Sequence, residues 1–380
     1  MDVGRFAAVD RSGTYSEKWQ KYAGRDVLPF WVADMDLPTA PFVIDAVRER
    51  LQHPILGYTR TPEPAARAFV DWIRHSYDWR VREDWLVWIP GVVPGFNVAA
   101  RALRHLGSDI VIPAPVYPPF LRVPRQAELR GVVSPLVRDG SRWVMDFDHL
   151  GANITPATAA VLFCNPHNPT GRVYDRHELD RLAALVLARD AVLISDEIHC
   201  PLILDAKCRH IPIASLDTAI EARTISLFAP TKAYNFPGVG IAVAVIPDGA
   251  LRERFEEVGK GLLGGVSPLA YAAATAAFND RSDWLREQNA FLAGNADTLA
   301  RAVAAMEGVA TTHVEGTYLA WLDVRALELP NPADWFEAFG LGLSDGVEFG
   351  APGFLRFNLG CSRSMLDAGI ERLRSAVEAA

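Results

Sequence analysis

The sequence reads Phe228-Ala229-Pro230-Thr231-Lys232-Ala233-Tyr234-Asn235-Phe236-Pro237-Gly238 directly after Thr224-Ile225-Ser226-Leu227, an apolar and β-branched run that is typical of a buried strand. Lys232 therefore stands near a strand end, among small, turn-forming and aromatic residues. Desolvation in such a pocket penalises the ammonium form and makes the amine more available as a nucleophile, which a Schiff-base lysine requires. The alternative is a strand-end lysine that extends into solvent.

Two further apolar runs end in polar side chains. The run 191–195 leads into Asp196-Glu197-Ile198-His199, and the run 160–164 leads into Asn165-Pro166-His167-Asn168-Pro169-Thr170-Gly171. Ligands of α/β sheets bind at the carboxyl ends of the strands. The three runs are therefore expected to deliver an asparagine, an aspartate and a lysine to one edge of a sheet.

These three motifs together resemble the pyridoxal 5'-phosphate enzymes of the aspartate aminotransferase fold. The resemblance extends over nearly the whole chain and implies an α/β protein of the PLP-dependent transferase fold type I. It implies that Lys232 forms the covalent link to the cofactor, that Asp196 pairs with the pyridine nitrogen and that Asn165 hydrogen-bonds the ring hydroxyl. Without it, Asp196 could equally be a helix N-cap and Asn165 a simple turn residue.

Seven strand candidates, mostly separated by helical patterns such as 175–189, predict a mainly parallel sheet with helices on both faces. They lie at 85–90, 109–113, 130–136, 159–164, 191–195, 223–228 and 240–246. Seven strands are also what the resembled fold implies for its large domain, which we expect at 47–277. That family builds a smaller α+β domain from both chain ends, here 1–46 and 278–380.

Other residues are expected around the cofactor because of the same resemblance. Tyr117 matches an aromatic residue that stacks on the ring, and a packing tyrosine in a proline-rich loop is the alternative. Backbone N–H groups of Val92 and Val93, at the start of a helix predicted over 96–106, could bind the phosphate together with the Thr231 hydroxyl. The chain departs from the aminotransferase pattern at Ala229, often a serine, and at Gly240, where aspartate aminotransferases carry a phosphate-binding arginine.

Arg356, in Phe354-Leu355-Arg356-Phe357-Asn358, matches the arginine that binds the substrate α-carboxylate, a task suited to a planar bidentate donor. Arg363 is a weaker candidate. Tyr117 and Asn165 are also expected to contact the substrate, and Tyr117 to act in catalysis with Lys232 and Asp196. Asp196, Glu197 and His199 could suggest a metal site, but their spacing is not a recognised zinc motif and adjacent residues on an extended chain point in opposite directions, so we expect none.

One branch of the family is matched more closely, namely the cystathionine β-lyases, or C–S lyases, of the MalY/PatB type. The matching segments are 31–36, Gly57-Tyr58, 115–120, 195–199 and 316–323, with an imperfect sixth at Cys361-Ser362-Arg363-Ser364, where the branch usually has proline at the second position. The implied reaction is a β-elimination in which Lys232 removes the α-proton and a cysteine S-conjugate such as cystathionine yields a thiol, pyruvate and ammonia. The alternatives are a PLP-dependent aminotransferase and a regulatory, protein-binding scaffold that retains the cofactor.

Tyr58 matches a tyrosine that, in the resembled branch, crosses a dimer interface to the phosphate of the neighbouring subunit. The resemblance therefore implies a homodimer with shared sites, although base rates favour a loop tyrosine that packs on its own subunit.

The net charge, the apolar runs and the placement of the cysteines are those expected of a cytoplasmic enzyme. The 380 residues carry a net charge of −8, which argues against nucleic-acid binding, since phosphate recognition needs a basic surface. No apolar run approaches the length of a membrane span and no signal peptide is visible. The four cysteines lie in or beside apolar runs without zinc or disulfide spacing, as expected of thiols in a reducing compartment.

Overall fold

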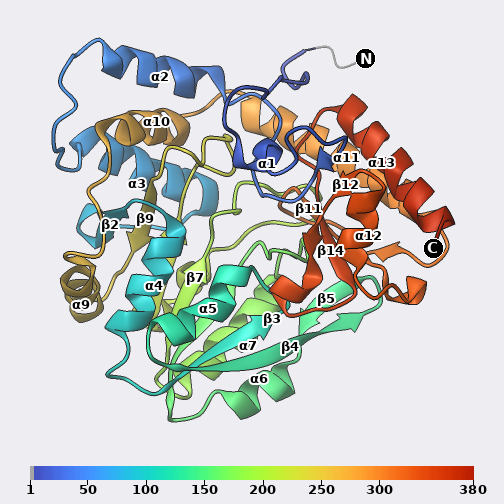
Figure 1. Cartoon of the computed structure of the whole chain (residues 1–380). Helices are drawn as coiled ribbons and strands as arrows, with labels where there is room; N and C mark the ends of the chain where they lie inside the picture. Colours follow the sequence, from blue (N-terminus) through green and yellow to red (C-terminus); the bar gives the residue numbers. More distant parts are fainter. Residues whose placement is uncertain (1–3) are drawn as a thin grey trace.

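Eight strands form the large sheet of the computed structural model, which describes residues 4–380 (Figure 1). Across the sheet the order is β2-β9-β8-β7-β6-β3-β4-β5. The strands are β2 (Leu86–Ile89), β3 (Asp109–Ala114), β4 (Arg130–Asp139), β5 (Arg142–Met145), β6 (Thr158–Cys164), β7 (Val192–Asp196), β8 (Thr224–Phe228) and β9 (Ala242–Val245). The α/β prediction is confirmed and all seven expected strands are present. The additional strand, β5, joins the edge as the second strand of an antiparallel hairpin with β4.

The central strands β3, β6, β7 and β8 are buried on both faces, which explains their continuous apolar sequences. Neighbouring residues point to opposite faces: in β6, Leu162 packs with the helices of one face and Phe163 with those of the other. The first face is covered by α4 (Val92–Ala102), α5 (Pro118–Gln126) and α9 (Gly249–Gly259), and the second by α6 (Phe147–Asn153) and α7 (Arg176–Leu187).

Helix α4 begins four residues earlier than predicted and ends at Ala102 instead of residue 106. Gly91 is its N-cap, so the helix follows almost directly on β2. Pro94 lies in the first turn, where the backbone N–H has no partner within the helix and a proline costs little. The expected start at residue 96 was therefore wrong, because Val92–Pro94 resembled a loop in sequence although it forms the first turn.

A second, smaller sheet has the order β10-β11-β14-β13 and lies in the C-terminal part of the chain. Its strands are β10 (Ala310–Thr311), β11 (Leu319–Asp323), β13 (Ser344–Asp345) and β14 (Phe354–Asn358), and its helices are α11 (Trp284–Ala304), α12 (Pro332–Ala338) and α13 (Arg363–Glu378). The N-terminal segment joins this part through the parallel pairing of β1 (Leu28–Pro29) with β12 (Leu341–Gly342). Figure 1 shows both chain ends on the same side of the molecule.

Helices α2 (Pro41–Leu51), α3 (Glu63–Tyr77) and α10 (Pro268–Phe278) pack together beside the large sheet. The predicted boundary at residues 46 and 47 falls inside α2, and the boundary at 277 and 278 falls at the end of α10. The division into 47–277 and the two ends therefore stays a prediction. The remaining helical segments are α1 (Glu17–Gln20), α8 (Thr218–Glu221), η1 (Glu83–Trp85), η2 (Ile213–Ser215), η3 (Arg325–Leu327) and η4 (Gly346–Phe349).

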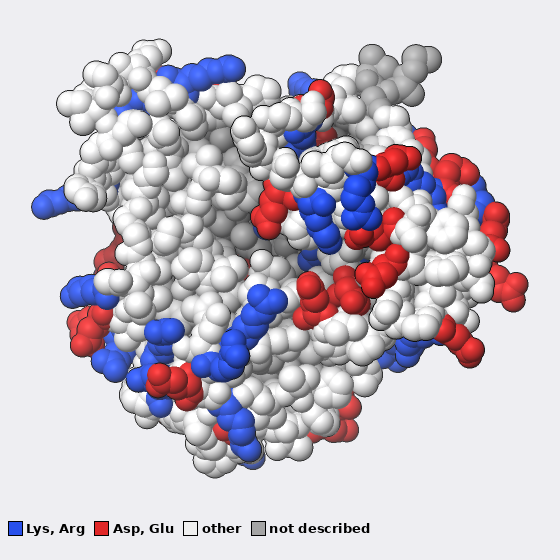
Figure 2. Space-filling model, in the orientation of Figure 1, with Lys and Arg blue, Asp and Glu red and all other residues white. Residues whose placement is uncertain are grey.

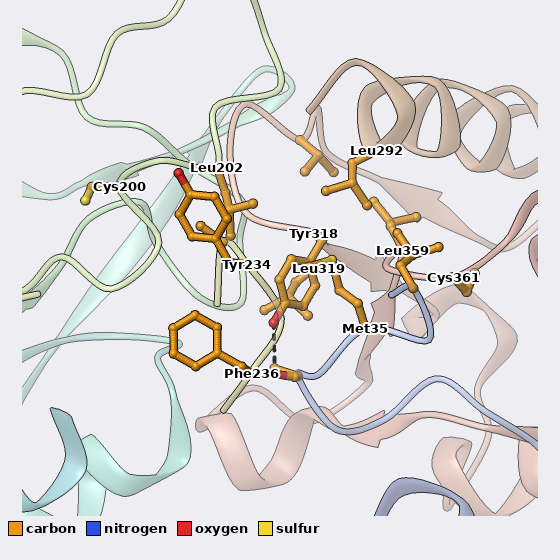
Figure 3. Packing of buried hydrophobic residues seen from close by; sticks show 14 of the residues in the cluster. Met35, Cys200, Leu202, Tyr234, Phe236, Leu292, Tyr318, Leu319, Leu359 and Cys361 are labelled. Carbon is orange, nitrogen blue, oxygen red and sulfur yellow. Dashed lines mark hydrogen bonds between the residues drawn. The ribbon is translucent and has the colours of Figure 1, made fainter. Parts of the chain in front are cut away.

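The N-terminal segment contributes to the core of the C-terminal part. Met35 lies close to Leu359 and Cys361 in Figure 3, and all three are buried. None of the helices between residues 4 and 380 combines the length and apolar character that a bilayer span requires.

Candidate active site

A cavity of about 190 Å³ lies at the carboxyl ends of β6, β7 and β8. Figure 2 shows a hollow between the C-terminal part and the rest of the molecule, with acidic and basic side chains on its rim. Six of the predicted site residues line this cavity: Val92, Val93, Tyr117, Asp196, Thr231 and Lys232. Parallel strands place their carboxyl ends at one edge, which explains how segments far apart in sequence meet here.

Lys232 follows β8 in a short turn and enters the cavity. Its Nζ donates a hydrogen bond of 2.5 Å to the carbonyl oxygen of Ala33. Burial lowers the pKa of Lys232 to about 8, and the positive charge of Arg356 acts in the same direction. A substantial fraction of the amine is therefore neutral near pH 8, as a nucleophile or a general base requires.

Asp196 ends β7 at the same edge, with 4% of its surface exposed. One carboxylate oxygen accepts a hydrogen bond of 3.1 Å from the backbone N–H of Ile198. Burial, with a smaller contribution from the charge of Glu197, raises the pKa of Asp196 to about 7. A carboxylate in such surroundings is stabilised by a cationic partner, because charge pairing offsets the loss of hydration.

The end of the cavity near α4 is suited to an anion. Among the described residues that line the cavity, Lys232 is the only Lys or Arg. This end is formed by Gly91, the two N-terminal valines of α4, Thr231 and Gly240. A helix N-terminus presents unpaired N–H groups and a partial positive charge. At Gly240 a Cβ atom would lie 2.6 Å from the carbonyl oxygen of Pro90, which gives a steric reason for the absence of an arginine there.

Asn168 lines the cavity, whereas Asn165 is not among the lining residues. Asn165 is buried at the end of β6; its Oδ1 accepts from the Tyr174 N–H at 3.1 Å and its Nδ2 has no partner within residues 4–380. Asn168 Oδ1 accepts a hydrogen bond of 3.0 Å from Arg356. The sequence analysis missed Asn168, although the second Asn-Pro pair of the same loop was a visible signal.

Arg356 lies on β14 with its guanidinium buried near the cavity wall. Besides Asn168, it donates to the carbonyl oxygen of Trp31 at 2.6 Å and to Ser344 Oγ at 3.3 Å. Its Nε has no partner in the described part of the chain. Burial lowers the pKa of Arg356 to about 10, so the group stays charged at neutral pH. Arg363, by contrast, donates to Gly294 and Thr298 of α11 and does not line the cavity.

The carbonyl of Ala33 is held by a network on the N-terminal segment. The Tyr318 hydroxyl donates to this carbonyl at 2.9 Å, as Figure 3 shows. Beneath it, Lys18 is fully buried and donates to Asp36 at 2.6 Å, while Arg11 pairs with both Asp34 and Asp36. This buried ionic network fixes the loop that forms the wall opposite Lys232.

Two rings complete the cavity wall. Tyr117 is the N-cap residue of α5, and burial raises the pKa of its hydroxyl, so it stays protonated. His199, which the sequence analysis considered only as a metal ligand, lines the cavity with its ring centroid 5.9 Å from that of Tyr318. Burial, then the charges of Lys232 and Arg356, lowers the pKa of His199 well below its usual value, so the imidazole is neutral.

Tyr58 differs from the other predicted site residues because its side chain is exposed to solvent and does not line the cavity. It lies in the loop between α2 and α3 and is fully exposed in the single chain. Ile55 and Leu56 of the same loop are also exposed, at 65% and 53%. The described chain therefore does not bring Tyr58 to its own cavity, and its expected action on a neighbouring subunit stays a prediction.

The residues around the cavity fit a flat, charged cofactor of the kind implied by the sequence. A buried carboxylate without a salt bridge to residues 4–380, an amine with a lowered pKa and a helix N-terminus lie around one space. These are the donor and acceptor types that a protonated pyridine nitrogen, an aldehyde and a phosphate need.

Comparison with known proteins gives concordant matches. The family model for aminotransferase class I and II matches residues 25–373. Cystathionine beta-lyase PatB of Bacillus subtilis is 32% identical, over 97% of this chain and 98% of its own length. Among solved structures, OvoB superimposes with a TM-score of 0.96 at 38% identity over the whole of both chains. Cystalysin from Treponema denticola, which contains pyridoxal 5'-phosphate, has a TM-score of 0.93 at 29% identity over the whole of both chains.

Proposed function

The chain belongs to the aminotransferase class I and II family, and on that basis we propose that it is a pyridoxal-phosphate-dependent carbon–sulfur lyase that cleaves cysteine S-conjugates by β-elimination. The observation that carries the proposal is the single cavity in which Lys232, Asp196 and Tyr117 meet beside the Asn168–Arg356 pair. The name of the Bacillus relative favours elimination over transamination. A scaffold that kept the cofactor only as a structural ligand would not need a lysine with a lowered pKa.

When bound, pyridoxal phosphate supplies an electron sink for the negative charge left by removal of the substrate α-proton. Lys232 would hold the cofactor covalently and, once displaced by the substrate amine, take the α-proton. The carbonyl of Ala33 gives the displaced amine a hydrogen-bond partner. Asp196 would keep the pyridine nitrogen protonated, and Tyr117 would stack on the ring and bound the substrate site.

Val92, Val93 and Thr231 would bind the phosphate. Asn168 is the better candidate for the ring hydroxyl, because it lines the cavity and Asn165 does not. Arg356 would bind the substrate α-carboxylate. A thiolate, whose conjugate acid has a pKa of about 8.5, is a good leaving group at the β-carbon. The products would be a thiol, pyruvate and ammonia.

A steady-state screen of cysteine S-conjugates, cystathionine included, tests the proposal. Elimination releases pyruvate and a free thiol in equal amounts. Transamination instead gives a keto acid that still carries the sulfur, while the amino group stays with the enzyme. Formation of that keto acid without thiol would contradict the lyase assignment.

Capture of the cofactor should depend on pH. With a pKa of about 8, about a quarter of the Lys232 amine is neutral near pH 7.5, against about a thousandth of an ordinary lysine. We expect the rate of covalent capture by cofactor-free protein to rise steeply from about pH 6 to pH 8 and then level off; ionisation of Asp196 acts in the same direction. Stopped-flow absorbance measures this rate. A rise that continues to about pH 10 would indicate an ordinary lysine.

The substitution Arg356→Lys should weaken substrate binding far more than cofactor binding. Lysine keeps the charge but loses the planar fork, and a hydrogen bond to a charged group contributes about 1.5–3 kcal/mol. We expect KM to rise about tenfold to a hundredfold while cofactor affinity changes less than about threefold. Arg363→Lys is the matched control, because Arg363 bonds to α11. An unchanged KM for Arg356→Lys would assign carboxylate binding to another residue.

The proposal includes a homodimer in which Tyr58 binds the cofactor phosphate of the neighbouring subunit. The exposed loop at 55–58 and the lack of an arginine at Gly240 support this arrangement. We also propose a cytoplasmic location, and the free cysteines Cys164, Cys200 and Cys208 are in keeping with it.

Mixing two inactive variants, Lys232→Ala and Tyr58→Ala, should restore activity if Tyr58 acts in trans. Each mixed dimer then has one site with both defects and one site with neither, so up to about half of the sites in mixed dimers are intact. Each variant incubated alone is the control, and mass spectrometry of tagged subunits verifies exchange. No recovery despite complete exchange, or a fully active Tyr58→Ala variant, would refute the shared site.

A further inference from the structure

Two side chains of opposite charge lie on segments that adjoin the candidate active site. Arg122 lies on α5, five residues after Tyr117, and Glu348 lies in η4, directly before Phe349. Both side chains are exposed, and within residues 4–380 neither takes part in an ion pair or a side-chain hydrogen bond. Arg11, by contrast, is paired with Asp34.

The two segments that carry these charges pack against each other. The Val116 N–H, just before Tyr117, donates to the Phe349 carbonyl at 3.2 Å. A Cβ atom at Gly350 would lie 3.7 Å from Leu121 of α5. In Figure 1, α5 borders the red, C-terminal segment beside the hollow that Figure 2 shows. The position of Glu348 relative to α5 is therefore set by backbone contacts.

Both charges are also close to the residues expected to bind substrate. The Phe349 ring lies under the guanidinium of Arg356, with 4.9 Å between the Arg356 Cζ and the ring centroid. Burial lowers the pKa of Arg356, and the negative charge of Glu348 is among those that oppose this shift. Burial raises the pKa of Tyr117; the charges of Arg356 and, more weakly, Arg122 oppose it.

A substrate that binds its α-carboxylate to Arg356 directs its β-substituent along the cavity toward the rim. Arg122 and Glu348, on the two segments next to the cavity, match in charge a group that carries both charges on one carbon. An amino-acid head group has this property, with a carboxylate and an ammonium on its α-carbon. An alkyl or aryl substituent would leave both side chains without a partner.

We propose that Arg122 and Glu348 select β-substituents that end in an amino-acid head group, with Arg122 binding the carboxylate and Glu348 the ammonium. This inference rests on the proposed function, because it concerns the leaving thiol of the same elimination. It makes the preferred substrates thioether-linked pairs of amino acids, of which cystathionine is one.

The test compares kcat/KM for four substrates that share the cysteine half and differ at the far end. Cystathionine carries both charges, S-carboxypropyl-L-cysteine only the carboxylate, S-aminopropyl-L-cysteine only the ammonium and S-propyl-L-cysteine neither. The variants are Arg122→Gln and Glu348→Gln. Arg189, just beyond α7, and Glu253, on α9, are both exposed; Arg189→Gln and Glu253→Gln change the net charge equally and serve as controls.

Arg122→Gln should lower kcat/KM about threefold to tenfold for cystathionine and the carboxylate substrate, the range expected for contacts between partly exposed charges. Glu348→Gln should do the same for cystathionine and the amine substrate. For S-propyl-L-cysteine, kcat/KM should stay within about twofold of the wild-type value for every variant. The control variants should match the wild type on all four substrates.

Equal losses on all four substrates, the reverse pairing of variant and substrate, or no loss on cystathionine would overturn the inference. The proposed function fails in a different way, when the wild-type enzyme releases thiol from none of the four. Cleavage of S-propyl-L-cysteine by the wild type therefore separates the two outcomes. Raising the salt concentration should shrink the cystathionine-specific loss and leave the S-propyl rate unchanged.

Discussion

Replacing Lys232 by alanine should lower kcat for β-elimination by at least about a thousandfold, since one side chain supplies both the covalent attachment and the general base. Pyruvate release measures the loss. Borohydride reduction of the wild-type enzyme should fix the chromophore to Lys232, as shown by peptide mapping. The same reduction of Lys232→Ala should leave the protein unlabelled.

Lys260→Ala and Lys207→Ala are the controls for this experiment, because neither lysine lines the cavity. Both should keep wild-type turnover and the label at Lys232. A small primary amine added to Lys232→Ala should restore a measurable part of the rate if the lost group is a base. Label on Lys260 or Lys207, or on no lysine, would contradict the assignment of the site.

Replacing Asp196 by asparagine should leave the cofactor bound but reduce kcat about a hundredfold to a thousandfold. Asparagine keeps the shape of the side chain and removes the charge that would hold a proton on the pyridine nitrogen. Loss of a charge partner in a buried site costs several kcal/mol, with about a tenfold change in rate for each 1.4 kcal/mol. Single-turnover measurements at saturating substrate give the chemical rate, and near wild-type turnover would assign Asp196 another role.

Unfolding experiments show whether the lower kcat of Asp196→Asn comes from a less stable fold. The folded-state pKa of Asp196, about 7, lies above its usual value of 3.8, so the folded protein binds the proton more tightly than the unfolded chain. The free energy of unfolding of the cofactor-free wild type therefore falls as pH rises from about 4 to 7, and Asp196→Asn lacks this loss. The variant should be at least as stable as the wild type at pH 8. Asp297→Asn, on the exposed side of α11, is the matched control.

The central strands and their terminal side chains could be predicted from sequence because buried parallel strands form continuous apolar runs that end at one edge. Lys232 and Asp196 were found in this way. Asn165 was predicted and Asn168 was not, because two Asn-Pro pairs look alike and only the path of the loop decides which side chain reaches the cavity. Strand β5 escaped detection because it has four residues and forms only when β4 turns back at Gly140.

Contacts between segments that are far apart in the sequence could not be predicted from it either. Nothing in the pattern around Trp31 indicates that its carbonyl accepts a hydrogen bond from Arg356, and nothing near Ala33 indicates the bond from Lys232. His199 follows Asp196 by three residues, but the turn that aims it into the cavity is a property of the folded backbone. For Tyr58, even the folded single chain leaves the side chain in solvent.

The hydrogen bond between Trp31 and Arg356 joins residues 325 positions apart in the chain. A ribosome therefore makes Trp31 long before Arg356, its partner across the cavity wall. Strands β6, β7 and β8 can assemble much earlier, since they lie within residues 158–228. Residues 33–36 can bond to Lys18, Lys232 and Asn235 before β14 is made, whereas the Trp31 carbonyl and Arg356 can be joined only after β14 leaves the exit tunnel, so this contact is among the last to close the cavity.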